Sequence, residues 1–287
     1  MNHTLFFQRA LSLLFWGIVL AALVMWLPPR LISQPAVGII RLNEDIWAGS
    51  LALVEMQIEE AREDDAIKAV VVQIDSPGGE VVASQALYLA LQNLRQEMPV
   101  VGSIDNMAAS GGYYVALATD PIFAKPSSNV GNIGVWAYAP EELSVNDVVL
   151  SSGPFKMTGS NRAEFLRELE SIKRDFVGTT TSQRGDRLHL TPAELAKGLL
   201  YLGREARDMG LIDEIGAERD AIEAAARQAH IANYEVVDLS QRVWDKLEEE
   251  AGWLSRTWVG TADPATGERQ LPPGIYLLYD PTLRGVP

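Results

Sequence analysis

Short apolar runs alternate along the chain with longer stretches in which apolar residues recur at helical spacing. The runs are rich in Val, Ile and Ala and predict buried strands at residues 36–42, 66–75, 100–104 and 121–124. The stretches at 50–64 and 80–98 have the period of amphipathic helices. Strands that alternate with helices predict βαβ units around a largely parallel sheet, which is an α/β fold.

The same alternation continues in the second half of the chain. Helices are predicted at residues 161–184, 204–209, 217–232 and 239–258, and a further helix start at Thr191-Pro192. Strands are predicted at 148–152, 211–215 and 234–239. In parallel sheets ligands bind at the carboxyl ends of the strands. The glycine-rich turns at 76–79 and 106–112 both follow predicted strands, so two turns distant in sequence can converge on one site.

An uncharged apolar run at the N-terminus indicates a membrane anchor in front of the α/β domain. Residues 11–27 read LSLLFWGIVLAALVMWL, and as a helix they span about 26 Å, the low end of a membrane span. The alternative is a cleaved signal peptide, but the segment before the run is weakly basic and no small-x-small site precedes Pro28. We expect an uncleaved anchor in residues 1–30; basic residues on both sides leave its orientation open.

Charge and composition exclude several classes of function. The 287 residues carry a formal net charge of −14 and no basic stripe, which argues against nucleic acid as a partner. There is no cysteine, so disulfides, thiolate catalysis and cysteine zinc sites are excluded. Of the three histidines only His189 is a plausible member of a Ser-His-Asp triad. A hydrolase with this sequence would more naturally use another base.

The stretch NMAASGGYYV at residues 106–115 offers a hydroxyl between small residues. Alanines and glycines around Ser110 let another chain approach it closely, and Gly111 can direct a backbone N–H into the same space. A nucleophile beside an oxyanion hole needs this arrangement. The alternative is a small-residue helix start where two elements pack tightly.

Two other pieces complete a candidate constellation. Asp75-Ser76-Pro77-Gly78-Gly79 places glycine N–H groups directly after a buried strand, which suits an oxyanion site or a tight turn. Lys156 follows a strand in the apolar context GPFKM. A solvated lysine holds its proton at neutral pH, whereas burial favours the neutral amine that can act as a general base. Taken alone, Lys156 is an ordinary surface lysine more often than a base.

Five motifs in this order, DSPGG, NMAASGGYYVA, VGNIGV, SGPFK and GLLYLGREARDMGLIDEIG, resemble the signal peptide peptidase A family, the S49 serine peptidases. The resemblance covers about residues 36–235. It implies a ClpP/crotonase-like fold and a Ser-Lys dyad, with Ser110 as nucleophile and Lys156 as general base. The oxyanion donors map onto Gly111 and onto Gly79 or Gly78. The resemblance also implies a membrane-associated, extracytoplasmic peptidase that cleaves remnant signal peptides and forms rings in which neighbours complete the site.

The sequence departs from the family pattern at three places. The segment 136–151 between VGNIGV and SGPFK is shorter than usual, which would reshape the substrate groove. Asn132 stands where the family commonly has serine, at a position that can orient the lysine; an amide can do this too. The residues after Lys156, MTGSNR, lack the usual proline. The chain is of the half-length type, so both catalytic residues fall in one repeat.

The sequence therefore predicts a membrane-anchored serine endopeptidase for apolar peptides, without cofactor or metal and assembled as a homo-oligomer. The expected parts are an anchor at 1–30, a peptidase domain at 31–239, and a C-terminal helix, linker and tail at 240–287. Two alternatives stay open. A crotonase-like acyl-CoA enzyme shares the fold and the oxyanion logic, although the acidic charge is poor for a phosphorylated cofactor. An inactive membrane-tethered scaffold would fit the shortened 136–151 segment.

The apolar C-terminal tail is unusual for a solvated chain end. Residues 271–287 read LPPGIYLLYDPTLRGVP, and their prolines oppose a regular helix, so an extended segment is predicted after the polar stretch 260–270. Such a strand could pair with a sheet edge, fill the peptide groove of its own or a neighbouring subunit, bind another membrane protein, or fray. We expect it to dock on the peptidase assembly and strengthen subunit association.

Overall fold

The computed structural model describes residues 12, 14–21, 34–138, 155–156, 159–251 and 275–278. Most described strands form one sheet in the order β10-β1-β2-β4-β5-β9, with β6 paired to β4 and β8 paired to β6. The strands of this sheet are β1 (Ala36–Leu42), β2 (Ile67–Ser76), β4 (Val100–Ala109), β5 (Ile122–Ala124), β6 (Asn129–Gly131), β8 (Leu200–Leu202), β9 (Glu214–Ile215) and β10 (Glu235–Asp238). All of these pairs are parallel except β6 with β8. The predicted α/β architecture with a mostly parallel sheet is confirmed.

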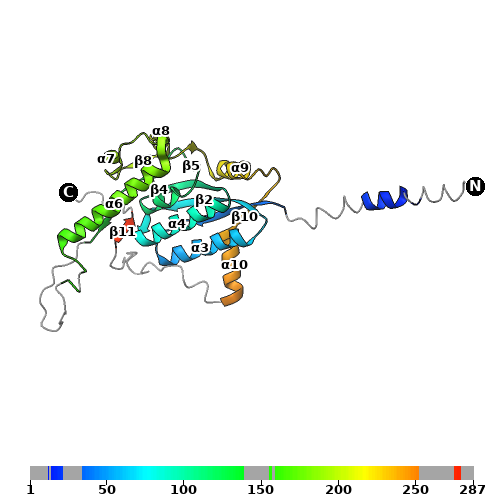
Figure 1. Cartoon of the computed structure of the whole chain (residues 1–287), viewed down its shortest axis with the longest axis horizontal. Coiled ribbons are helices and arrows are strands. Elements are labelled where there is room, and N and C mark those ends of the chain that lie inside the picture. The colour runs from blue at the N-terminus through cyan, green and yellow to red at the C-terminus, as the bar shows by residue number, and fades with distance from the viewer. Residues whose placement is uncertain are drawn as a thin grey trace, which may run out of the picture.

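Helices cover both faces of this sheet. They are α3 (Ala48–Glu63), α4 (Val81–Glu97), α5 (Gly111–Ala116), α6 (Arg162–Arg184), α7 (Pro192–Leu195), α8 (Gly203–Asp208), α9 (Glu218–Gln228) and α10 (Leu239–Ala251). Figure 1 shows α3 and α4 side by side across the sheet, with α9 apart from them. The strands alternate their side chains between the two layers, as a sheet buried on both faces requires. In β2, Val70 and Val72 join the core on the α3 and α4 side, whereas Ala69 and Val71 pack with the alanines of α9.

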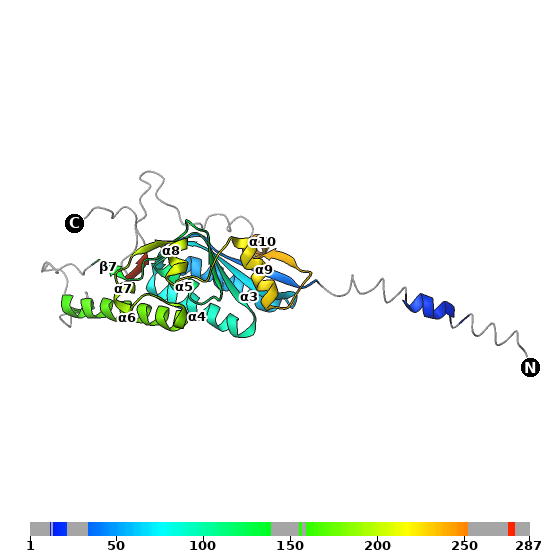
Figure 2. The same ribbon diagram turned by 90° about the horizontal axis from the view of Figure 1, so that it is seen from above.

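A second, smaller sheet lies beside the first and is antiparallel. Its strands are β3 (Gly78–Glu80), β11 (Ile275–Leu278) and β7 (Trp136–Ala137), with β11 in the middle. β11, drawn in red, lies next to β7 in Figure 2. The C-terminal tail, predicted to be extended, therefore includes a strand that pairs within the same chain. Its predicted effect on subunit association stays a prediction.

Elements with a strong period are found where the sequence predicts them, and four short strands are not predicted. The predicted strand 36–42 matches β1, and the predicted helix 161–184 matches α6. β4 runs on to Ala109 instead of ending at residue 104. The sequence does not predict β3, β6, β7 or β8, which have two or three residues each. The predicted strand 148–152 lies outside the described residues.

Of the predicted anchor the structure describes only residues 12 and 14–21, and residues 14–21 are helical. The rest of the run 11–27 lies outside the described residues. Within the described ranges, no helix has both the length and the apolar character that a membrane crossing requires.

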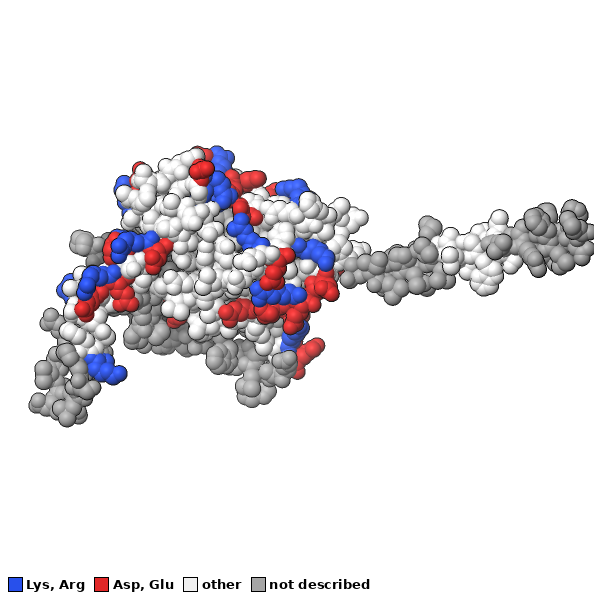
Figure 3. All heavy atoms as spheres, viewed as in Figure 1, with Lys and Arg blue, Asp and Glu red and all other residues white. Residues whose placement is uncertain are grey.

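Charges on the surface are interspersed rather than separated. On the face shown in Figure 3, basic and acidic side chains lie next to one another, and no basic stripe crosses that face. Ion pairs account for part of this pattern: Arg62 contacts Glu59 and Glu97, and Arg242 on α10 contacts Asp64 at the end of α3. That nucleic acid is not a partner stays a prediction.

Candidate active site

Ser110 lies at the carboxyl end of β4, in the single-residue turn that leads into α5. Its backbone has φ 51° and ψ −118°, a conformation that L-residues rarely adopt and that is concentrated at active sites and ligand-binding turns. Two hydrogen bonds hold the turn: the Ser110 N–H donates to the Gly131 carbonyl at 2.8 Å, and the Tyr114 N–H donates to the Ser110 carbonyl at 2.9 Å. The residue as a whole is 2% exposed, and its hydroxyl bonds to none of the described residues. The sharp turn thus presents an uncommitted hydroxyl.

The end of β4 is held in position by a carboxylate on the neighbouring strand. Ile74 pairs with Ile104 and Ser76 pairs with Ala108, so β4 has an irregularity opposite Asp75. Asp75 accepts a hydrogen bond from the Asn106 side-chain amide at 2.6 Å and one from the Met107 N–H at 3.2 Å. Irregularities of this kind re-aim a strand and are frequent beside active sites. Asp75 therefore holds Asn106 and Met107, just before Ser110, in position.

The SPGG turn and the Ser110 turn pack together through glycines. A Cβ on Gly112 would lie 2.6 Å from the Ser76 carbonyl oxygen, and one on Gly79 would lie 1.9 Å from the Ile46 carbonyl oxygen. Any larger residue would force the backbone apart at either position. The predicted convergence of the two glycine-rich turns is therefore seen in the structure.

The backbone N–H groups of this region differ in what they already bond. The Gly78 N–H donates to the Ser76 hydroxyl at 3.2 Å. The Glu80 N–H donates to the Ile46 carbonyl and the Gly78 carbonyl accepts from the Ile46 N–H, both at 2.8 Å. Because successive residues of a strand direct their backbone groups to opposite edges, the N–H of Gly79 faces the edge of β3 away from Ile46. Gly79 is thus a better oxyanion candidate than Gly78.

The second candidate donor is the backbone of Gly111. Gly111 is the first residue of α5 and is buried. The first N–H groups of a helix have no partner within the helix, and they point along its axis toward the preceding turn. Since α5 packs against β3, Gly111 and Gly79 lie on neighbouring elements beside Ser110; their role as oxyanion donors stays a prediction.

Lys156 is exposed, in a turn together with Phe155. No hydrogen bond or ion pair joins its ammonium group to Ser110 or to any other residue that the structure describes. Residues 139–154 and 157–158 lie outside the described residues, and with them lies most of the shortened 136–151 segment. The structure therefore brings together the serine and the candidate oxyanion glycines, and the pairing of Ser110 with Lys156 stays a prediction.

Asn132 directly follows Gly131, the residue that binds the Ser110 N–H. Its backbone is left-handed with φ 54°, a region in which asparagine is several-fold enriched. The Asn132 N–H donates to the Leu199 carbonyl at 2.8 Å, and its side-chain amide donates to the Gly198 carbonyl at 2.9 Å. Asn132 thus ties β6 to the segment before β8; its predicted contact with the lysine stays a prediction.

His189 is occupied elsewhere. It is exposed, its Nδ1 lies 2.7 Å from the Asp208 carbonyl oxygen, and its backbone N–H donates to Met209. That the base is a residue other than histidine stays a prediction. Among the described residues no group of three or more acidic or histidine side chains could hold a metal ion.

The site contains residues that sequence reasoning did not single out. Ile46 forms an isolated parallel bridge with Gly79, and Asp75 binds the approach to Ser110. The signal for Asp75 was present, since a carboxylate at the end of a buried strand next to a Ser-Pro-Gly-Gly turn is unusual. Ile46 carried no signal, because its role depends on backbone groups alone.

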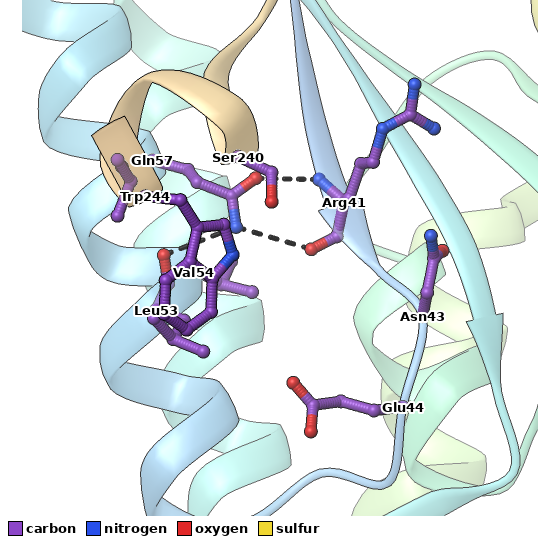
Figure 4. Close-up of a pocket in the computed structure, with 9 residues that line it drawn as sticks. Arg41, Asn43, Glu44, Leu53, Val54, Gln57, Ser240 and Trp244 are labelled. Atoms are coloured by element: carbon purple, nitrogen blue, oxygen red, sulfur yellow. Dashed lines mark hydrogen bonds between the residues drawn. The ribbon is translucent and has the colours of Figure 1, made fainter. Parts of the chain in front are cut away.

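Figure 4 shows a separate cavity of about 290 Å³ between β1, α3 and α10. Gln57 spans it, accepting from the Arg41 N–H at 2.8 Å and donating to the Arg41 carbonyl at 3.3 Å. The Arg41 guanidinium turns away to Asp238 and Glu218. The cavity contains none of the candidate site residues and belongs to the packing of α10.

An ion-pair network lies at the opposite, amino edge of the sheet. Arg184 is 2% exposed and pairs with Asp213 at 2.8 Å, while Arg187 contacts both Asp213 and Asp120 at 2.9 Å. Burial acts to raise the pKa of Asp213, but the hydrogen bonds and charge of Arg184 outweigh it and hold that pKa below its usual value. Nearby, burial raises the pKa of Tyr113, whose hydroxyl donates to the Leu211 carbonyl.

Comparison with known proteins relates this arrangement to a protease family. The sequence profile of peptidase family S49 matches residues 92–232, and that of the NfeD1b N-terminal domain matches residues 36–141. A Methanocaldococcus jannaschii protein named as a candidate protease is 31% identical over 215 residues, which are 70% of this chain and 67% of that protein. The chain belongs to peptidase family S49. Its resemblance to that family is thus confirmed.

Other relatives of this S49 chain have similar names. A candidate protease from Synechocystis is 35% identical over 58% of this chain and 65% of its own length. A candidate signal peptide peptidase from Enterococcus faecium is 28% identical over 69% of this chain and 61% of its own length. The chain therefore spans about two thirds of the length of these relatives, and the S49 match alone does not assign their activities to it.

Proposed function

We propose that this S49 chain is a membrane-anchored serine endopeptidase that cleaves extended apolar peptides with Ser110 and Lys156. The observation that carries the proposal is the strained backbone of Ser110 at the end of a buried strand, beside two glycine-rich turns. Strain of about 1–3 kcal/mol persists only where the surroundings enforce it. A sharp strand-to-helix turn that presents a hydroxyl is a known way to position a nucleophile.

The chemistry follows from the groups in this site. The Ser110 Oγ attacks the peptide carbonyl carbon, and its proton passes to the neutral Nζ of Lys156. The negative charge that develops on the carbonyl oxygen is bound by the N–H groups of Gly111 and Gly79. The C–N bond then breaks as Lys156 returns the proton to the leaving amine. Water, deprotonated by the same lysine, hydrolyses the acyl-enzyme and restores Ser110.

Lys156 comes to this mechanism from the SGPFK motif of the S49 resemblance. It is exposed in the single chain, and a general base of this type requires removal from water. In the ring assembly that the resemblance implies, a neighbouring subunit can supply that burial. Turnover should then rise with pH, since only the deprotonated amine can accept the proton of Ser110.

The membrane and substrate assignments rest on the sequence. The uncharged run 11–27 would anchor the chain, with the peptidase domain outside the cytoplasm as the resemblance implies. An anchored domain meets peptides that stay close to the bilayer. Remnant signal peptides are apolar and have this location, so we propose them as the substrate class.

The test is labelling of the full chain in detergent with a fluorophosphonate, which reacts with activated serines. We expect stoichiometric labelling that Ser110→Ala abolishes and Ser103→Ala keeps, since Ser103 is similarly buried but lies within β4, the strand that ends just before Ser110. Lys156→Ala should reduce peptide hydrolysis on the order of 10⁴-fold, whereas Lys173→Ala should not, since Lys173 pairs with Glu170 on the same helix. His189→Ala should have little effect. Absence of labelling at Ser110 would leave the scaffold alternative.

A further inference from the structure

β11 is the middle strand of the small sheet and lies directly against the candidate oxyanion strand. Tyr276 pairs with Glu80, Leu277 with Gly79 and Leu278 with Gly78, all antiparallel. On its other edge, Ile275 pairs with Ala137 and Tyr276 with Trp136 of β7. β11 also contacts α5, the helix that starts immediately after Ser110. A segment from the end of the chain thus fills a slot between β3 and β7, and it lies against the helix that follows the candidate nucleophile.

The directions of the backbone groups define what this slot binds. Ile46 pairs with one edge of β3: its N–H donates to the Gly78 carbonyl, and its carbonyl accepts from the Glu80 N–H. The N–H and C=O of Gly79 therefore face the other edge, and the residue paired with Gly79 there is Leu277. An extended chain in this slot presents its own backbone to the N–H that we assign to the oxyanion hole.

A peptide substrate needs the same position. Extended peptides are commonly recognised by strand addition, in which main-chain hydrogen bonds supply affinity and any extended chain can pair. A scissile carbonyl on the Gly79 N–H would lie where β11 pairs with β3. Substrate and β11 therefore exclude each other.

We propose that residues 275–278 are an internal occupant of the substrate-strand position, so that the C-terminal segment competes with extended apolar peptides for the slot between β3 and β7. The occupant has the sequence IYLL, without a charge, and this gives the class of peptide that the slot accepts. The competition with substrate rests on the proposed peptidase function, whereas the occupied slot does not. A competitor on the same chain acts at an effective concentration of the order of millimolar, so it weakens peptide binding without abolishing it.

The first test measures binding and needs no catalysis. A fluorescent synthetic peptide with the sequence of residues 271–287 is titrated against the full chain, and against Leu277→Pro, and followed by anisotropy. Proline at this position removes the N–H that faces the Gly79 carbonyl and disfavours the strand. We expect about tenfold tighter binding to Leu277→Pro than to the unaltered chain. Leu277→Val keeps an apolar strand residue and should bind like the unaltered chain.

The second test measures the pairing itself. Backbone amides at residues 78–80 and 136–137 should exchange hydrogen faster in Leu277→Pro than in Leu277→Val, because β11 no longer covers β3 and β7. Deletion of residues 271–287 should reproduce both effects and guards against misfolding of the proline variant. Unchanged exchange together with unchanged binding would overturn the proposal. A shift that depends on protein concentration would assign the strand to a second copy and also overturn it.

Kinetics separate this proposal from the peptidase assignment. If both hold, Leu277→Pro lowers KM for an apolar peptide several-fold and leaves kcat unchanged, since only competition has been removed. Tighter peptide binding and faster exchange without any hydrolysis would reject the peptidase and support the occupied slot. Hydrolysis with equal KM, binding and exchange in all variants would support the peptidase and reject the occupant.

Discussion

The two ends of the parallel strands, carboxyl and amino, are held by different kinds of interaction. At the carboxyl edge, Ser110, Gly79 and Gly112 meet through backbone groups and close glycine contacts, and the nucleophile candidate has a strained backbone. At the amino edge, Arg184 and Asp213 form a buried ion pair that Arg187 extends to Asp120. The first end leaves the Ser110 hydroxyl without a bond to any described residue, whereas at the other end the charged side chains pair with one another.

The difference has a physical reason in the connections of the fold. Asp120 lies just before β5, and Asp213 lies just before β9. The N–H of Ile122, the first residue of β5, donates to the Asp213 carboxylate at 2.7 Å. Carboxylates at strand starts accept from backbone N–H groups and hold the incoming chain. At the carboxyl ends of the strands, side chains bind only part of the backbone: Ser76 accepts from the Gly78 N–H, and the backbone of Gly79 is paired with Leu277 of β11 instead. Stability and proposed activity are thus concentrated at opposite edges.

The largest effect on stability is expected at the amino edge. Asp213→Asn leaves the buried Arg184 guanidinium without its counter-charge, which typically costs about 3–5 kcal/mol. Denaturant unfolding of the full chain should show this loss. Asp208→Asn is the matched control: Asp208 also pairs with an arginine, but its side chain is 67% exposed, so the cost should stay below about 1 kcal/mol. Equal effects of the two variants would contradict the comparison.

A smaller effect is expected where the two glycine turns meet. Gly112→Ala places a Cβ 2.6 Å from the Ser76 carbonyl, and overpacking of this kind costs about 1–3 kcal/mol. It should also lower peptide turnover on the order of 10²-fold if the added Cβ displaces Ser110 by about 1 Å.

Gly178→Ala is the control for the glycine substitution. Gly178 lies in α6 with no atom within 4 Å of its added Cβ, so alanine should stabilise the helix by about 0.5–1 kcal/mol. Opposite signs of the two stability changes would support the close approach at Gly112. A stabilising Gly112→Ala would refute it.

Backbone strain at Ser110 is expected to lower the free energy of unfolding by about 1 kcal/mol. Ser110→Gly relieves the left-handed conformation, while Ser110→Ala keeps a Cβ and hence the strain. Both variants lose the hydroxyl, so any difference in their unfolding free energies isolates the backbone. We expect Ser110→Gly to be the more stable of the two. Equal stabilities would mean that the strain is no larger than the entropic cost of glycine, about 0.5–1 kcal/mol.

The smallest expected effect is on how the free energy of unfolding changes as the pH is lowered. The pKa of Asp213 is lower in the folded chain than in the unfolded one, so its contribution is present above the unfolded value near 3.9 and is lost as pH falls through the folded value. Unfolding free energies measured from pH 6 down to pH 3 should fall more steeply for the unaltered chain than for Asp213→Asn. Parallel curves would exclude Asp213 as a source of the acid sensitivity.

Much of the site was predictable because its residues cluster in short motifs. Ser110 and Gly111 stand out in a run of small residues, and Gly78 and Gly79 in a Ser-Pro-Gly-Gly turn after an apolar strand. The choice between Gly78 and Gly79 was not predictable. That choice depends on two contacts of the folded chain. The Ser76 hydroxyl accepts a hydrogen bond from the Gly78 N–H, and the pairing of Ile46 with β3 fixes the direction of the Gly79 backbone groups.

By itself the sequence determined the α/β class, the positions of the long elements and the family, because apolar periodicity and glycine motifs are local properties of the chain. Only the tertiary structure decided that β3 exists and what pairs with it. A three-residue strand has too little period to be recognised, and its partner β11 lies almost two hundred residues further along the chain. Pairing of this kind is set by which sheet edge stays open, and that edge forms only when β2, Ile46 and α5 are packed in place.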